Sequence, residues 1–199
     1  MKTSGTRHVA NIMEPFFAGR FVSWDELLLY LLAGVIGSIT AIAAVGFNYL
    51  IDQVDMLAYG GRVFEGGFRA YHLFLILIPA AGGLLVGLIG RFYAREATGH
   101  GVPEVMYAIV RRDCKIKLHV AVARAVTAAL TIGSGGSAGP EGPIIQIGAA
   151  IASWTGRFVH VLQHHMPVLI GCGAAAGIAA IFRAPIAGVL FVMEVFLRD

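Results

Sequence analysis

Apolar residues gather in long uncharged runs along this chain, and the first two runs are the clearest. Residues 27–51 carry no formal charge, and residues 72–90 form a second uncharged run. A helix that crosses a bilayer about 30 Å thick needs roughly 20 predominantly apolar residues. Both runs are long enough, so the pattern predicts membrane-spanning helices at about 27–50 and 72–93, joined by a polar connector at 51–71.

Beyond residue 116 the apolar segments are shorter and are interrupted by glycine and proline. They predict helices at about 116–132, 142–160 and 166–182, with a last helix after a break at 182–188. Another helix of about ten residues is predicted to start near Pro103, because Gly-x-Gly followed by proline is a helix-start signal. Several of these helices are too short to span, as in transporters whose broken helices surround a binding site. The predicted fold class is an all-α polytopic membrane protein with broken and re-entrant helices.

Composition supports a membrane location. Hydrophobic residues make up 57% of the chain and charged residues 14%, and the mean hydropathy is +0.76, whereas a soluble domain carries about 25% charged residues. The net charge of +3 is too small to indicate a nucleic acid partner, and the two cysteines are far apart in the sequence. They indicate neither a disulfide framework nor a metal spacing. No metal site and no nucleic acid partner are therefore expected.

Basic residues predict the orientation of the chain in the membrane. Arginine and lysine concentrate at 91–117, and cytoplasmic segments are enriched in these residues. Because two spans precede this stretch, residues 1–26 are predicted to be a cytoplasmic N-terminal lead, and they do not resemble a cleaved signal peptide. A transmembrane domain is expected over 27–199, in a bacterial inner (plasma) membrane.

The most informative segment is a glycine-rich break at 133–143, in which Glu141 is the only charged residue. A carboxylate at membrane depth is costly and indicates a functional site. Exposed backbone groups persist at that depth only where they line a protein or water-filled cavity. The alternative interpretation is an ordinary surface loop with one exposed acid.

Helix starts explain what such a break could bind. The first N–H groups of a helix have no partner within it and carry about half a positive charge. Two converging starts would make an anion site without a charged side chain, and that site would bind weakly enough to let a transported anion leave. Glu141 could occupy such a site itself and leave it on protonation. A phosphate-binding loop is disfavoured, because the Gly-Lys-Ser/Thr ending of that motif is missing.

Three segments resemble the first half of the CLC family of chloride channels and proton/chloride exchangers. Gly99-His-Gly-Val-Pro103 resembles its Gly-Ser-Gly-Ile-Pro motif, and Gly139-Pro-Glu-Gly-Pro143 resembles Gly-Arg/Lys-Glu-Gly-Pro. The third segment is the Gly/Ala-rich stretch from Gly173 through an Ala-Pro-x-Ala-Gly turn to Glu194. The resemblance covers about 27–199 and implies one half of an inverted-repeat fold.

The resemblance also implies a function and a site. It implies chloride transport gated by Glu141, with backbone amides around Glu141, Gly142 and Ile144 facing the anion. The implied anion-binding residues are Gly99, His100, Gly101, Val102, Pro103, Gly139, Pro140, Gly142, Pro143 and Ile144. Chloride is the expected ligand, protons are a further expected partner, and no organic cofactor is expected. A homodimer through the helices near 184–199 is implied, as is a missing second half of the fold. That half is expected outside 1–199, and the alternative is that two copies of the chain combine.

Four positions depart from the family pattern. His100 stands at the pore serine, so that its imidazole could donate an N–H in place of the hydroxyl, and Pro140 replaces a basic residue. Arg183 stands where asparagine is common and is expected at the membrane interface. Val195 stands at the inner glutamate of the exchangers. Because valine cannot relay a proton, the last departure favours a channel or a loosely coupled exchanger.

Two alternatives stay open from the residues alone. One is a transporter of another small anion, because a histidine at the central site could change selectivity. The other is a membrane-embedded hydrolase in which His100 and Glu141 act as an acid/base pair, although no nucleophile motif supports an enzyme. Arg124, within an otherwise uncharged helix, is expected to contact lipid headgroups or another subunit.

Overall fold

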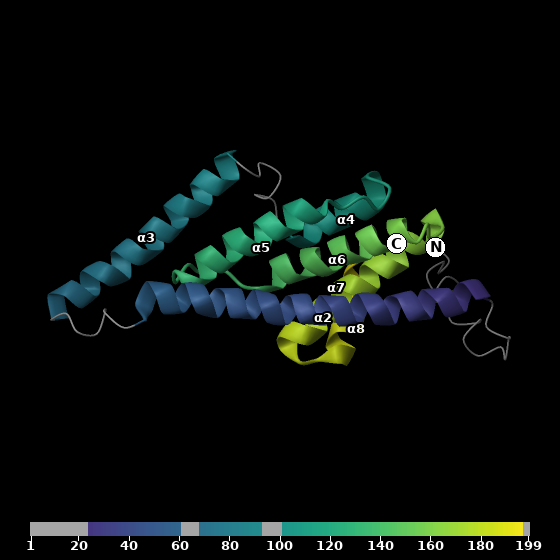
Figure 1. Cartoon of the computed structure of the whole chain (residues 1–199), viewed down its shortest axis with the longest axis horizontal. Helices are drawn as coiled ribbons and strands as arrows, with labels where there is room; N and C mark the ends of the chain where they lie inside the picture. Colours follow the sequence, from purple (N-terminus) through teal and green to yellow (C-terminus); the bar gives the residue numbers. More distant parts are fainter. Residues whose placement is uncertain (1–23, 61–67, 93–100, 197–199) are drawn as a thin grey trace, which may run out of the picture. The chain divides into compact units, whose positions relative to one another are not determined.

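The computed structural model describes residues 24–60, 68–92 and 101–196. Within these ranges the chain is helical apart from short connectors and contains no strand (Figure 1). The all-α prediction is therefore confirmed. The chain divides between Leu31 and Leu32 into two units. The described residues of the first unit are the start of a helix, and the contacts below lie within the second unit.

The two predicted spans correspond to the long helices α2 (Trp24–Tyr59) and α3 (Phe68–Phe92) (Figure 1). The prediction of a connector from residue 51 was wrong, because α2 continues through Asp52 and Asp55 to Tyr59. Both aspartates are exposed, so they interrupt no packing. The helix ends at Tyr59, and two consecutive glycines, Gly60 and Gly61, follow it in the sequence. Glycine loses the most conformational freedom on entering a helix.

The remaining helices are short. They are α4 (Gly101–Arg111), α5 (Leu118–Gly133), α6 (Glu141–Phe158), α7 (Met166–Phe182) and α8 (Pro185–Val195), with a 3-10 turn η2 (Gln163–His165) before α7. Of these, α5, α6, α7 and α8 begin or end beside the predicted glycine and proline breaks at 133–143 and 182–188. The predicted half-helix is confirmed as α4, which has 11 residues. By length and apolar composition, the described segments long enough to cross a membrane are Glu26–Tyr59 and Gln163–Phe182, whereas the apolar segment Leu75–Arg91 of the predicted second span is shorter.

Helix α6 lies at the centre of the packing, against α4, α5 and α7, and α7 packs in turn against α8. The closest approach joins Gly148 of α6 to Gly173 of α7. A Cβ atom added to Gly148 would lie 2.7 Å from the carbonyl carbon of Gly173, and one added to Gly173 would lie 2.8 Å from that of Gly148. Gly177 lies similarly against the Ile144 carbonyl. Small residues therefore let the two backbones touch, as in helix pairs packed within lipid.

Side chains of α6 hold the connector between α4 and α5. Ser153 Oγ donates to the carbonyl of Cys114 at 2.6 Å and accepts the N–H of Ile116 at 3.1 Å. The connector needs this support because Asp113 and Cys114 have φ values of 47° and 61°, a left-handed conformation that costs L-residues roughly 1–2 kcal/mol each. Burial raises the pKa of the Cys114 thiol, and the charge of Asp113 raises it further.

Candidate functional site

The glycine-rich break lies between the end of α5 and the start of α6. Pro140 caps α6 with φ −76° and ψ −8°, and Glu141 is the first helical residue. Proline suits a helix start because its missing N–H would have no helical acceptor there. The N–H of Ile144 donates to the Pro140 carbonyl at 3.1 Å, so this amide, expected to face the anion, is already engaged. The amides of Glu141 and Gly142 precede it in the first turn, where a helix offers them no acceptor.

The start of α4 meets the start of α6. Gly101, the first residue of α4, is buried against Gly142. A Cβ atom on Gly101 would lie 2.8 Å from the Gly142 Cα atom, which leaves no room for any side chain. Two helix N-termini, each with a partial positive charge, therefore converge at one point.

Glu141 stands at this point with an exposed side chain. Its carboxylate folds back over Gly139, because a Cβ atom on Gly139 would lie 2.7 Å from Glu141 Cδ and 2.9 Å from Oε1. Within the described ranges, Glu141 forms no ion pair. The carboxylate thus lies beside the partly positive start of its own helix, which favours a negative charge.

Tyr59, the last residue of α2, contacts the glycine-rich break. The Tyr59 hydroxyl donates to the carbonyl of Ser134 at 2.9 Å. The next residue, Gly135, has φ +85°, and a Cβ atom there would lie 2.6 Å from Tyr59 Oη. Glycine is required here by both the left-handed backbone and the close hydroxyl. No local pattern in the sequence indicates a role for Tyr59, because its partner lies 75 residues away and the predicted connector included Tyr59.

The structure brings together most of the predicted anion-binding residues. Gly101, Val102 and Pro103 form the first turn of α4, and Glu141, Gly142 and Pro143 form that of α6. Gly139 and Pro140 lead into α6, and Ile144 is fully buried beneath Gly177. Gly99 and His100 lie outside the described residues. The acid/base pair of His100 with Glu141 therefore stays a prediction.

The expectation for Arg124 was wrong. Its side chain is only 6% exposed, and its Nη2 atom lies 3.3 Å from Oε2 of Glu104. Arg124 belongs to α5 and Glu104 to the first turn of α4. The arginine therefore joins two helices inside the chain and does not face lipid headgroups. Sequence reasoning missed the pair because the carboxylate lies in another segment, 20 positions earlier.

Comparison with known proteins identifies the family of the chain. The family model described as voltage gated chloride channel matches residues 82–199. The chain belongs to this family, so the resemblance to the CLC proteins and to their all-α membrane fold is confirmed. The members of this family are integral membrane channels and transporters, not enzymes.

Individual relatives cover most of this chain. It is 35% identical over 82% of its length to the putative chloride channel protein ClcB-like of Ralstonia nicotianae. It is 33% identical over 84% of its length to the H(+)/Cl(-) exchange transporter ClcA of Citrobacter koseri, and 30% identical over 87% to the chloride channel protein CLC-f of Arabidopsis thaliana. The chain spans 40%, 36% and 23% of the lengths of these three relatives, respectively.

Proposed function

We propose that this chain supplies one half of a chloride pathway across a membrane, in which helix starts hold the anion and Glu141 gates it. The observation that carries the proposal is the meeting of Gly101 and Gly142 at the starts of α4 and α6, with the exposed Glu141 carboxylate beside them. The similarity to a putative chloride channel and to a proton/chloride exchanger supports chloride as the anion.

The mechanism follows from competition for one site. Unpaired N–H groups and two helix dipoles attract an anion without binding it as tightly as a fixed cation would. When Glu141 is ionised, its carboxylate occupies the same positive end and excludes chloride. When Glu141 is protonated, that attraction is lost and chloride enters. His100, on the segment leading into α4, is proposed to donate an imidazole N–H to the anion.

The proposed pathway needs further protein. The chain spans at most 40% of the length of the relatives described above, so we assign transport to the assembly in which these helices meet the remaining helices of the fold. A homodimer is proposed through α8, whose large apolar side chains Ile186, Leu190 and Met193 are 77%, 59% and 53% exposed. The proposed location is a bacterial inner membrane with the N-terminus in the cytoplasm, and chloride is proposed as the ligand with no organic cofactor.

The substitution Glu141→Gln tests this function in liposomes that contain the intact protein as it is made in the cell. Glutamine imitates the protonated gate, so chloride efflux should persist and become nearly equal at about pH 4.5 and about pH 7.5. Unsubstituted protein should conduct at least several-fold more at the acid value, because a lower pH favours the protonated, open gate.

Glu194→Gln is the matched control, because Glu194 is also an exposed helical glutamate but lies near the end of α8. It should keep the pH dependence of the unsubstituted protein. If Glu141→Gln leaves the pH dependence intact, Glu141 is not the gate. If it abolishes a hydrolytic turnover in place of altering chloride efflux, the enzyme alternative is correct.

A further inference from the structure

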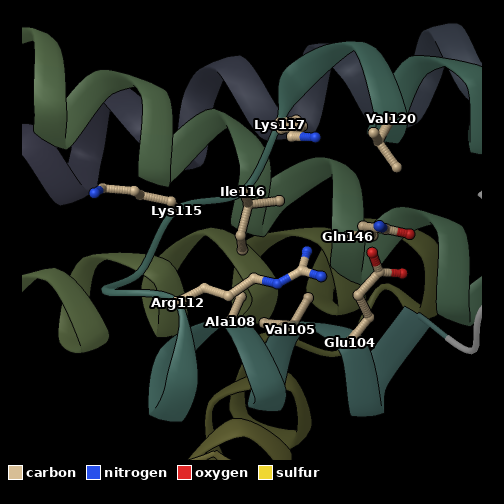
Figure 2. Close-up of a pocket in the computed structure, with 9 residues that line it drawn as sticks. All are labelled: Glu104, Val105, Ala108, Arg112, Lys115, Ile116, Lys117, Val120 and Gln146. Carbon is tan, nitrogen blue, oxygen red and sulfur yellow. The ribbon is translucent and has the colours of Figure 1, made fainter. Parts of the chain in front are cut away.

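A small pocket lies one turn inside the meeting point of α4 and α6. Its volume is about 10 Å³, and Glu104 and Gln146 are among the residues that line it. These residues follow Gly101 and Gly142 by three and four positions, so they lie on the helix faces that meet at the two glycines. Figure 2 shows the Glu104 carboxylate directed toward the Gln146 side chain at one end of this pocket.

Both polar side chains present acceptor oxygens. Gln146 is 1% exposed, and its Oε1 atom accepts no hydrogen bond from the described residues. The Oε2 atom of Glu104 is also buried without a hydrogen bond there, although Arg124 Nη2 lies 3.3 Å from it. A buried acceptor without a donor is unfavourable, and nearly all such groups in native proteins are satisfied by protein or by ordered water.

We propose that this pocket binds one water molecule, which donates its two hydrogens to Gln146 Oε1 and Glu104 Oε2. The volume matches the roughly 10–15 Å³ that one water needs, and two polar partners are enough to hold it. The site does not suit chloride, because two acceptor oxygens repel an anion. It does not suit a divalent cation either, since Arg112, Lys115 and Lys117 also line the pocket and Arg124 adjoins Glu104.

The water would extend an existing connection. The Glu104–Arg124 pair already joins α4 to α5, and the water adds α6 through Gln146. Three helices would then be fixed to one another a single turn from Gly101 and Gly142. Gln146 and Glu104 are thus positioning residues for the proposed anion site. This role rests on the proposed function, whereas the binding of the water molecule does not depend on it.

The substitution Gln146→Met distinguishes a bridged oxygen from an unsatisfied one. Methionine has a similar length and no strong acceptor, so it removes the bridge without emptying the position. If the water is bound, the midpoint of thermal unfolding of the intact protein should fall by about 2–4 °C. If Oε1 has no donor, the same change should leave the midpoint unchanged or raise it, which would overturn the proposal. Gln53→Met is the control, since Gln53 is an exposed glutamine in α2, and its midpoint should not move.

Two further measurements complete the test. A high-resolution density map of the intact protein should show one peak within hydrogen-bond distance of both oxygens. A pocket without density, in a map that resolves other buried waters, or an anomalous peak there after exchange of chloride for bromide, would overturn the water site.

In transport, Gln146→Met should raise the chloride concentration for half-maximal flux by about threefold or more and leave the Glu141-dependent pH profile in place. An unchanged half-maximal concentration would refute the positioning role. Failure of the Glu141→Gln test alone would refute the proposed gate and leave the water site standing.

Discussion

Tyr59 supports the glycine-rich break through a single hydroxyl group, which makes the residue a direct test of the site at the smallest scale. Its O–H donates to the Ser134 carbonyl at 2.9 Å, seven residues before Glu141. Tyr59→Phe removes this bond and leaves the ring, so the free energy of unfolding should fall by about 0.5–1.5 kcal/mol. Thermal unfolding in detergent measures this loss.

The control for Tyr59→Phe is Tyr49→Phe, on the same helix, where the side chain is 63% exposed. That change should alter stability by less than about 0.5 kcal/mol, as is usual for surface substitutions. Equal stability of the two variants would mean that the bond between Tyr59 and Ser134 does not support the break.

Individual residues also show which parts of the candidate site can be predicted from the sequence. Glu141 and its flanking glycines and prolines were identified because one charge in an apolar, proline-rich break is a local signal. The partners Tyr59 and Arg124 were not, since their contacts depend on helices that meet only in the folded chain. The hydrogen bond from the Ile144 N–H to the Pro140 carbonyl was not foreseen either, because it depends on where α6 begins.

At the scale of helices, the crossing of α6 and α7 is the strongest packing prediction. Gly148→Ala would place a Cβ atom 2.7 Å from the Gly173 carbonyl carbon. The added Cβ atom would press against the backbone of α7, which cannot rotate away as a flexible side chain could. We therefore expect a loss of about 1–3 kcal/mol in the free energy of unfolding. The measurement is again the midpoint of thermal unfolding.

Gly83→Ala provides the contrast, because an added Cβ atom in α3 meets nothing within 4 Å in the described structure. In a helix interior alanine is favoured over glycine by about 0.5–1 kcal/mol, so this variant should be as stable as the parent or more stable. Both substitutions replace glycine with alanine inside a helix, and they differ in that only Gly148 lies where α6 crosses α7. A similar loss in both would show that helix propensity and not contact controls these positions.

The boundaries around 133–143 and 182–188 were predictable because these breaks contain glycine or proline, whose effects are local. The end of α2 was not, since Asp52 and Asp55 suggest a loop although a helix accepts exposed aspartates. Polarity alone therefore misplaces a boundary when no residue that breaks helices is present. The packing of α6 against α4, α5 and α7 has no counterpart in the sequence pattern, which reports length and hydrophobicity but not neighbours.

For the molecule as a whole, Val195 bears on whether the proposed chloride pathway is coupled to protons. Val195, half-buried at the end of α8, stands where exchangers of the CLC family are expected to carry an acid. We predict that the intact protein in weakly buffered liposomes passes chloride with little proton movement. Val195→Glu should increase proton uptake driven by a chloride gradient at least severalfold, because a carboxylate relays a proton and a valine does not.

Val195→Gln is the matched control, as glutamine has the same size as glutamate but does not titrate. It should leave proton movement at the level of the parent. Strong uphill proton movement by the unsubstituted protein would contradict the prediction and would show that coupling in this chain does not depend on an acid at position 195.

The contact between Gly101 and Gly142 also limits how this protein can vary. Every single-base missense change in a glycine codon introduces a residue with a Cβ atom, and at Gly101 that atom would lie 2.6 Å from the Gly142 carbonyl carbon. At Gly142 an added Cβ atom would lie 3.8 Å from Gly101 N, an ordinary contact. Two adjoining glycines should therefore differ in genetic tolerance: a saturation library selected for folded protein should retain alanine and serine codons at position 142 and lose every substitution at position 101.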